Sequence, residues 1–327
     1  MSSRESMIQS DKVELFVDLV RKYLLPNFKI SSSMAIVSAA ATKANYATLS
    51  QSDCFDAYYG SSYHYRGENK FIHFTSFETC LKILESKKFL LSSLSVMDDK
   101  LEVDHLHNIF ESLGLKERES YFIKKDLYAL SLCEFDVEQN EESLDMWRIY
   151  SDNCRGVGLV LEFDLAYSYH WVHYALSKVK YGHEGVDKII AFSKAYQEFI
   201  KSNNGFKIRG IDELLRNLLS NHKSGIYKSE REVRLLFTGK LYEKELKLKH
   251  SCEIEFESKL RKEDFEKYKV TQERLDHIFP NITISSILIG PKVSKKEFDK
   301  NAQEINVLTQ RYNTVPKVEH SLLKKYF

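Results

Sequence analysis

Residues 228–237 read KSEREVRLLF, in which charged residues are followed by a block of apolar ones. Alternate side chains of an extended strand share a face, so we expect Glu230, Glu232 and Arg234 on one side. The apolar residues from Val233 to Phe237 predict that the strand enters the core. Paired carboxylates at such a point stabilise developing positive charge, which makes them candidate catalytic groups. The alternative is a surface strand with a cross-strand ion pair.

Short apolar runs elsewhere predict further strands, at residues 71–75, 89–92, 128–133, 156–163, 252–256 and 284–289. Helical spacing of apolar residues, or a capping residue, predicts helices at 11–25, 77–87, 144–150 and through most of 185–224. Short strands and helices in this irregular order predict an α+β fold. The pattern changes near residue 69, which predicts an N-terminal helical extension over 1–69 and an α+β domain over 70–327.

Composition excludes several classes of protein. The 327 residues include 48 Lys and Arg against 47 Asp and Glu, so the net charge of +1 argues against a strongly basic nucleic-acid binder. Only 12 Gly and 4 Pro argue against disorder. The five cysteines form no C-x-x-C, and the sequence shows neither a signal-like start nor a long apolar run. We therefore expect a cytoplasmic protein with no membrane span.

Known nucleotide and hydrolase motifs are missing from the sequence. It has no G-x-G-x-x-G after a predicted strand, no Walker A loop, no H-E-x-x-H and no G-x-S-x-G. These absences argue against a Rossmann dehydrogenase, a P-loop NTPase, a zincin and an α/β-hydrolase.

Two further segments carry candidate binding residues. His73 and Thr75 share a face of the strand FIHFT and together can bind a ribose or a phosphate; the alternative is a half-buried core histidine. Trp147 and Tyr150 are i,i+3 neighbours on the predicted helix 144–150. Their rings can stack on a base or a nicotinamide, or they form a pair within the core.

An acidic segment suggests a different chemistry. Asp98, Asp99 and Glu102, with Asp104, His105 and His107 beyond them, are residue types that bind divalent metals. The alternative is a helix start, where acidic residues are favoured by the macrodipole. Together with Glu230 and Glu232, the segment leaves open a metal-dependent nuclease or phosphoesterase.

Taken in order, these segments resemble a bacterial family known as the domain of unknown function 2971, over residues 70–310. The motifs that carry the resemblance are His73-Phe74-Thr75, Asp99 with Glu102, Met146-Trp147-x-x-Tyr150 followed by Gly158 to Phe163, Glu230-x-Glu232-x-Arg234, and Ile289-Gly290-Pro291. Phe74 and Ser229 each stand where the family has a tyrosine.

That layout is similar to the ADP-ribosyltransferase superfamily, and the resemblance implies a split, mixed β-sheet core that binds NAD as substrate. His73 would hold the ribose of NAD, Glu232 would be the catalytic glutamate, and Glu230 would orient the acceptor. Trp147 or Tyr150 would stack on a ring, and Phe74, Thr75 and Arg234 complete the expected NAD-binding set. No metal site is implied.

The resemblance also implies a biological role. An NAD-dependent transferase of this kind passes ADP-ribose to a protein or a nucleic acid, and it is an NAD glycohydrolase if water is the acceptor. Such enzymes serve as bacterial toxins or phage-defence effectors, in which residues 1–69 would bind a regulatory partner. The remaining alternative is a non-catalytic interaction module of a defence system.

Overall fold

The computed structural model describes residues 3–29, 46–48, 61–94, 127–135, 142–166, 168, 171, 174–209, 211–237, 251–255 and 279–327. They belong to two compact units, each made of three stretches of sequence. A helical unit contains Met1–Tyr65, Leu94–Leu127 and Ser177–Tyr227, and a sheet unit contains Arg66–Ser93, Tyr128–Leu176 and Lys228–Phe327. The boundary expected between residues 69 and 70 stays a prediction.

Three helices form most of the described helical unit: α1 (Ser3–Tyr23), α7 (Val186–Ser202) and α8 (Ile211–Leu219). α1 ends before Pro26, as the sequence predicts, and packs on α7, where the rings of Phe16 and Tyr196 lie 5.8 Å apart. Two short strand pairs complete the unit: β1 (Tyr46–Thr48) with β8 (Lys207–Arg209), and β7 (Lys180–Tyr181) with β9 (His222–Lys223). The helices α7 and α8 cover most of the stretch 185–224, as the sequence predicts.

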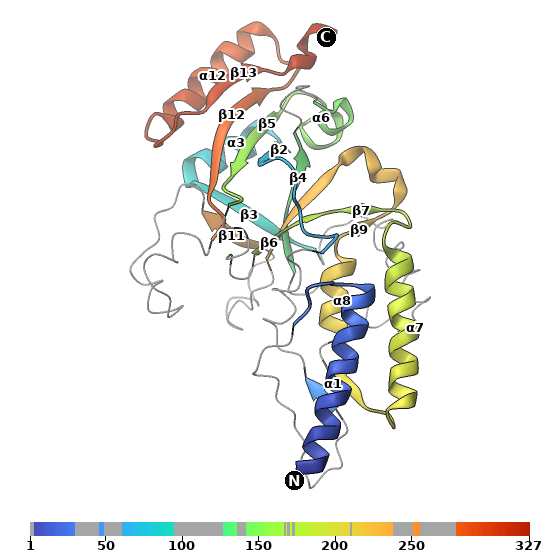
Figure 1. Cartoon of the computed structure of the whole chain (residues 1–327). Helices are drawn as coiled ribbons and strands as arrows, with labels where there is room; N and C mark the ends of the chain where they lie inside the picture. Colours follow the sequence, from blue (N-terminus) through green and yellow to red (C-terminus); the bar gives the residue numbers. More distant parts are fainter. Residues whose placement is uncertain are drawn as a thin grey trace. The chain divides into compact units, whose positions relative to one another are not determined.

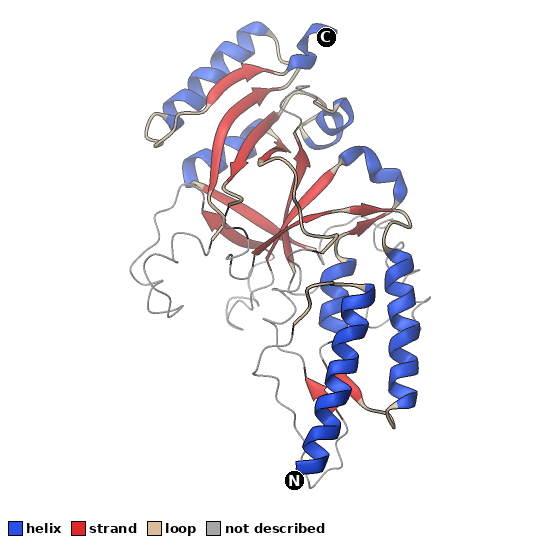
Figure 2. Ribbon diagram, in the orientation of Figure 1, coloured by secondary structure: helices blue, strands red, loops and turns tan. Residues whose placement is uncertain are grey.

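The sheet unit is built on a mixed sheet (Figures 1 and 2). Its described strands are β2 (Lys70–Thr75), β3 (Lys88–Ser93), β4 (Tyr128–Glu134), β5 (Val157–Phe163), β6 (Tyr174–Lys178), β10 (Glu232–Phe237), β11 (Ser251–Glu255), β12 (Ile282–Ile289) and β13 (Lys317–His320). The order is β11-β3-β4-β2-β5-β12-β13, and β10 pairs with β4 and β6. β12 and β13 are parallel, whereas β4 runs antiparallel to its neighbours β2, β3 and β10. The predicted α+β class is confirmed.

The sheet opens along one edge of β4. β10 pairs with β4 from Tyr128 to Cys133, so it occupies one whole edge of that strand. On the other edge, β3 pairs only at Tyr128 and Ala129, and β2 only at Cys133 and Glu134. Between these two contacts β2 and β3 diverge, and no strand among the described residues pairs with β4 from 130 to 132 on that edge.

Three helices pack against strands of the sheet unit. α3 (Phe77–Ser86) follows β2 directly, and the Ser76 hydroxyl caps it by accepting a hydrogen bond from the Thr79 amide, as the sequence predicts. α6 (Leu144–Tyr150) packs against β2, and α12 (Lys295–Thr309) packs on α3 and β13. Two 3₁₀ helices, η2 (Gly225–Glu230) and η3 (Leu322–Tyr326), complete the described elements. No helix among these residues is long and apolar enough to cross a membrane.

Candidate active site

The segment 228–237 enters the sheet through a sharp turn. η2 ends at Glu230, Arg231 has a left-handed backbone with φ of 45°, and β10 begins at Glu232. Glu232 and Arg234 therefore share a face of β10 as expected, whereas Glu230 lies before the strand and is positioned by η2. All three are buried, with exposed fractions of 5% for Glu230, 3% for Glu232 and 0% for Arg234. This segment is not a surface strand.

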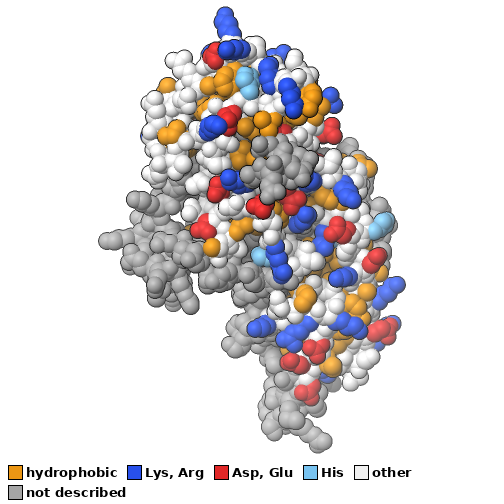
Figure 3. Space-filling view, turned by 45° about the horizontal axis from the view of Figure 1, so that its top comes forward, with side chains coloured by type: hydrophobic (Ala, Val, Ile, Leu, Met, Phe, Trp, Pro, Cys, Tyr) orange, Lys and Arg blue, Asp and Glu red, His pale blue; other side chains and the backbone are white. Residues whose placement is uncertain are grey.

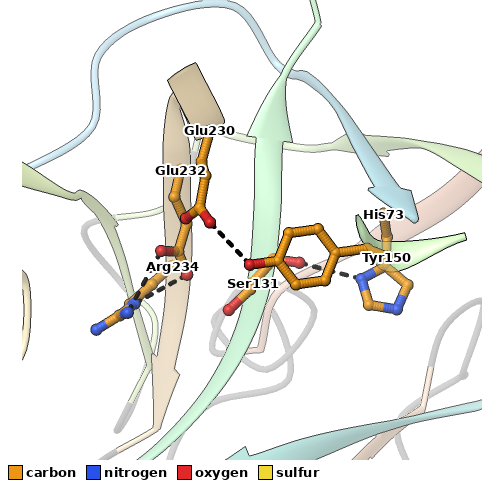
Figure 4. Close-up of polar contacts among 6 residues, drawn as sticks. All are labelled: His73, Ser131, Tyr150, Glu230, Glu232 and Arg234. Atoms are coloured by element: carbon orange, nitrogen blue, oxygen red, sulfur yellow. Dashed lines mark hydrogen bonds and ion pairs between the residues drawn. The ribbon is translucent and has the colours of Figure 1, made fainter. Parts of the chain in front are cut away.

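Glu232 and Arg234 form a buried ion pair within one strand. The Arg234 Nε donates to Glu232 Oε1 at 2.9 Å, and Nη2 donates to Oε2 at 3.3 Å (Figure 4). The planar guanidinium matches both oxygens of the carboxylate, which fixes its orientation. Because a buried charge is costly unless it is paired, Arg234 stabilises Glu232 in its ionised form.

Glu230 is held by a residue from a different helix. The hydroxyl of Tyr150, at the end of α6, donates a 2.7 Å hydrogen bond to Glu230 Oε1 (Figure 4). Burial, this hydrogen bond and the charges of Glu230 and Glu232 raise the pKa of the Tyr150 phenol above its usual value. The phenol therefore stays protonated and acts as a donor, with both carboxylates close enough to influence it.

A small pocket opens beside Glu230. It is lined by Ile72, Phe74, Cys133, Glu134, Glu142, Ser143, Ser229, Glu230 and Arg231. Its interior has room for about one water molecule. Of the residues predicted from the sequence, Phe74 and Glu230 line this pocket, whereas Glu232 and His73 do not.

Glu142, which lines the pocket, is held in place by three hydrogen bonds. Its Oε2 accepts a 2.8 Å hydrogen bond from the Trp147 indole and another from the Ser321 hydroxyl, and its Oε1 accepts from the Leu322 amide at 2.8 Å. These bonds join the start of α6 to η3. Sequence analysis missed Glu142, because its partners at 321 and 322 are about 180 residues away.

The side chain of His73 points away from the face of the sheet that carries Glu232. Ile72 and Glu232 both lie opposite Cys133, so these three side chains share one face and His73, the next residue of β2, points to the opposite one. The Nδ1 of His73 lies 3.0 Å from the carbonyl oxygen of Ser131, in the stretch where β2 and β3 diverge (Figure 4). The structure therefore does not bring His73 onto the carboxylate face.

The surroundings of His73 favour its neutral form. Burial lowers the pKa of its imidazole, although the hydrogen bond to Ser131 acts in the opposite direction. The ring also meets Phe89 of β3 edge-on, with centroids 5.8 Å apart. In the neutral ring Nδ1–H donates to Ser131, and Nε2 carries the lone pair.

The two predicted stacking residues differ. Trp147 is fully buried, meets Phe74 edge-on with centroids 5.1 Å apart, and lies 3.5 Å from where a Cβ on Gly158 would sit. It belongs to the core and presents no exposed ring. Tyr150 is 43% exposed, so its ring is the one accessible to a ligand. Thr75 is buried at the end of β2, on the face of His73.

The structure gives the metal-dependent alternative no support. Asp98, Asp99, Glu102, Asp104, His105 and His107 lie outside the described residues. Among those that are described, no group of three or more His, Cys, Asp or Glu residues is arranged to hold a metal ion.

Comparison of the chain with protein-family models, with curated proteins and with solved structures found no match in any of the three. The chemical interpretation of the site consequently depends on its own residues.

Proposed function

We propose that the sheet unit is an ADP-ribosyltransferase-like enzyme that breaks the nicotinamide–ribose bond of NAD, with Glu230 and Glu232 as its essential carboxylates. The observation that carries the proposal is a group of four hydrogen-bonded side chains beside a pocket: the buried Glu230, Glu232 and Arg234, and the partly exposed Tyr150. The opening of the sheet between β2 and β3 adds support, because the resemblance to ADP-ribosyltransferases implies a split sheet. A role as a cytoplasmic bacterial toxin or phage-defence effector rests on that resemblance alone.

The chemistry needs a fixed negative charge near the ribose. When the bond between C1′ and the nicotinamide nitrogen breaks, its electron pair leaves with the neutral nicotinamide and positive charge develops on C1′ and O4′. A carboxylate held in a partly dry pocket stabilises that charge more strongly than one in water. The acceptor then forms its bond to C1′, and a nearby carboxylate takes the proton that the acceptor loses.

The geometry favours Glu230 for contact with the substrate, because Glu230 lines the pocket. Glu232 is engaged by Arg234 and serves to fix the start of β10 and the field around the Tyr150 phenol. The resemblance implies that Glu232 is the catalytic glutamate, whereas this assignment gives the contact with the substrate to Glu230. Tyr150 and Phe74, and not the buried Trp147, contact the ring of the substrate in this proposal.

The proposal places two demands on the protein. A nicotinamide ring is larger than one water molecule, so the pocket must widen when the substrate binds. His73 must act from the other face of the sheet or have a structural role, since its Nδ1 is engaged by Ser131.

The test is release of free nicotinamide from NAD by the full chain. We expect release by the wild type that persists in EDTA, a loss of about 10²–10³-fold in Glu230→Gln, and a loss in Glu232→Gln as well. Glu78→Gln, which changes an exposed carboxylate on α3, is the matched control and should keep full activity. A wild type that releases nicotinamide only with a divalent metal would instead support the metal-dependent alternative.

A further inference from the structure

A basic and aromatic surface surrounds η3 in the sheet unit. Lys292 Nζ lies 5.7 Å from the ring centroid of Phe327, and Lys325 Nζ lies 5.0 Å from that of Tyr326. Both rings are exposed, by 70% for Tyr326 and 51% for Phe327. Two exposed rings, each with an ammonium group beside it, present stacking surface and positive charge together.

Three chain segments build this surface, which we call the η3 surface: residues 151–156, 290–297 and 322–327. They are joined by backbone and side-chain contacts: the Lys292 amide donates to the Cys154 carbonyl at 3.1 Å, and Lys324 Nζ donates to the carbonyls of Pro291 at 3.2 Å and Val293 at 2.8 Å. Lys324 is thus a structural anchor, and it holds η3 in place.

Positive charge dominates the η3 surface although the whole chain is nearly neutral. Its basic residues are Arg155, Lys292, Lys295, Lys296, Lys324 and Lys325, and its acidic residues are Asp152 and Glu297. The Glu297 carboxylate is bound by Ser294 at the start of α12, and its pKa is lowered by those hydrogen bonds and by the charges of Arg155 and Lys324. Figure 3 shows Lys and Arg side chains next to hydrophobic ones over the upper part of the molecule.

The η3 surface is connected to the pocket beside Glu230. Glu142 lines that pocket and accepts hydrogen bonds from Ser321 and Leu322, where η3 begins. Tyr150, which binds Glu230, is followed directly by segment 151–156 of the surface. The start of η3 is therefore hydrogen-bonded to the wall of the pocket.

We propose that the η3 surface binds single-stranded nucleic acid and that this strand is the acceptor of ADP-ribose. Ammonium and guanidinium groups neutralise phosphates, and exposed aromatic rings stack on bases. An acidic peptide would use the charges but leave the rings without a stacking partner. The binding stands on the η3 surface itself, whereas the acceptor role rests on the proposed function.

The binding test is fluorescence anisotropy of a labelled single-stranded RNA with the full chain, over a range of salt concentrations. We expect Lys292→Glu/Lys325→Glu to weaken binding by more than about 100-fold and to lower the salt slope by about 1.4, which corresponds to two phosphate contacts on a single strand. Tyr326→Ala/Phe327→Ala should weaken it by at least about 30-fold with the slope retained. Lys188→Glu/Lys194→Glu on α7 makes the same change in net charge at exposed positions and should bind like the wild type.

Two binding results would overturn the inference. One is equal affinity of the wild type and the η3 variants for the RNA, with circular dichroism showing all of them folded. The other is binding to phosphatidylserine vesicles without binding to the RNA, which would assign the surface to anionic membranes.

The acceptor role is tested with NAD labelled in its adenylate part and the same RNA. Label on the RNA that is lost in Lys292→Glu/Lys325→Glu, while nicotinamide release continues, supports the inference. Nicotinamide release by the wild type without label on the RNA contradicts the acceptor role but leaves the proposed function intact. RNA binding without any nicotinamide release contradicts the proposed function and keeps the binding surface.

Discussion

The hydroxyl of Tyr150 donates a 2.7 Å hydrogen bond to Glu230, which lies 80 positions later in the chain. The contact ties the end of α6 to the end of η2, immediately before the left-handed turn at Arg231 that leads into β10. It orients one carboxylate of the proposed site while Arg234 orients the other. The two carboxylates are therefore positioned by different parts of the sheet unit.

Replacing Tyr150 with Phe tests the first of these contacts. The variant keeps the ring but removes the donor to Glu230, so the carboxylate loses a charge-assisted hydrogen bond that is worth about 1.5–3 kcal/mol. We expect nicotinamide release to fall by at least about 10-fold. The free energy of unfolding should change by less than the roughly 1.5–3 kcal/mol of the hydrogen bond. A Tyr150→Phe variant with wild-type turnover would show that the hydroxyl has no part in the reaction.

Arg234→Met tests the second contact through stability. Leaving the buried Glu232 carboxylate without its guanidinium should cost about 3–5 kcal/mol in the free energy of unfolding, measured by urea denaturation. The double variant Glu232→Gln/Arg234→Met should recover much of that loss, because no buried charge is left unpaired. Lys82→Met, which breaks the exposed pair with Glu78, is the control and should change little. Equal losses in Arg234→Met and Lys82→Met would contradict a buried pair.

His73 gives the protein a stability that depends on pH. Because burial lowers its pKa in the folded state below the value near 6.5 in the unfolded chain, the unfolded state binds the proton first as pH falls. The contribution of His73 to the free energy of unfolding is therefore complete above pH 6.5, and it decreases as pH falls toward the pKa of the folded state. We expect urea denaturation between pH 7.5 and 5 to show a smaller pH dependence in His73→Asn than in the wild type. An identical dependence would mean that His73 is not desolvated.

Gly156 lies so close to the backbone of Thr75 that there is no room for a Cβ at this position. A Cβ at this position would lie 2.3 Å from the backbone oxygen of Thr75, at the end of β2. Since a backbone atom cannot move away as a side chain can, we expect Gly156→Ala to lower the free energy of unfolding by about 1–3 kcal/mol. Gly225→Ala, whose Cβ would find its nearest neighbour at 3.8 Å, is the control. Similar unfolding midpoints for the two variants would contradict this packing.

The elements that could be predicted from sequence are those with a strong local signal. Apolar runs gave the positions of β2, β4, β5 and β10 to within a residue or two, and Ser76 marked the start of α3. The segment after residue 291 was not assigned, although Ser294 and Glu297 form a capping box at the start of α12. That signal is local, so the start of α12 is predictable from the sequence alone.

The arrangement of the site could not be predicted in the same way. Alternation correctly places His73 with Thr75 and Glu232 with Arg234, but the face that each pair occupies depends on how β2 and β10 are both registered on Cys133 of β4. Register between distant strands has no local signal. Nor does the left-handed turn at Arg231, a conformation rare for arginine, which removes Glu230 from the strand.

The central claim is that Glu230 acts on the nicotinamide–ribose bond of NAD. The most direct measurement is the rate of nicotinamide release by wild type and Glu230→Gln at equal concentrations of folded protein. The account predicts release by the wild type and a rate at least about 100-fold lower in Glu230→Gln, with an unchanged unfolding midpoint. Equal rates in the two proteins, or no release by the wild type, would contradict it.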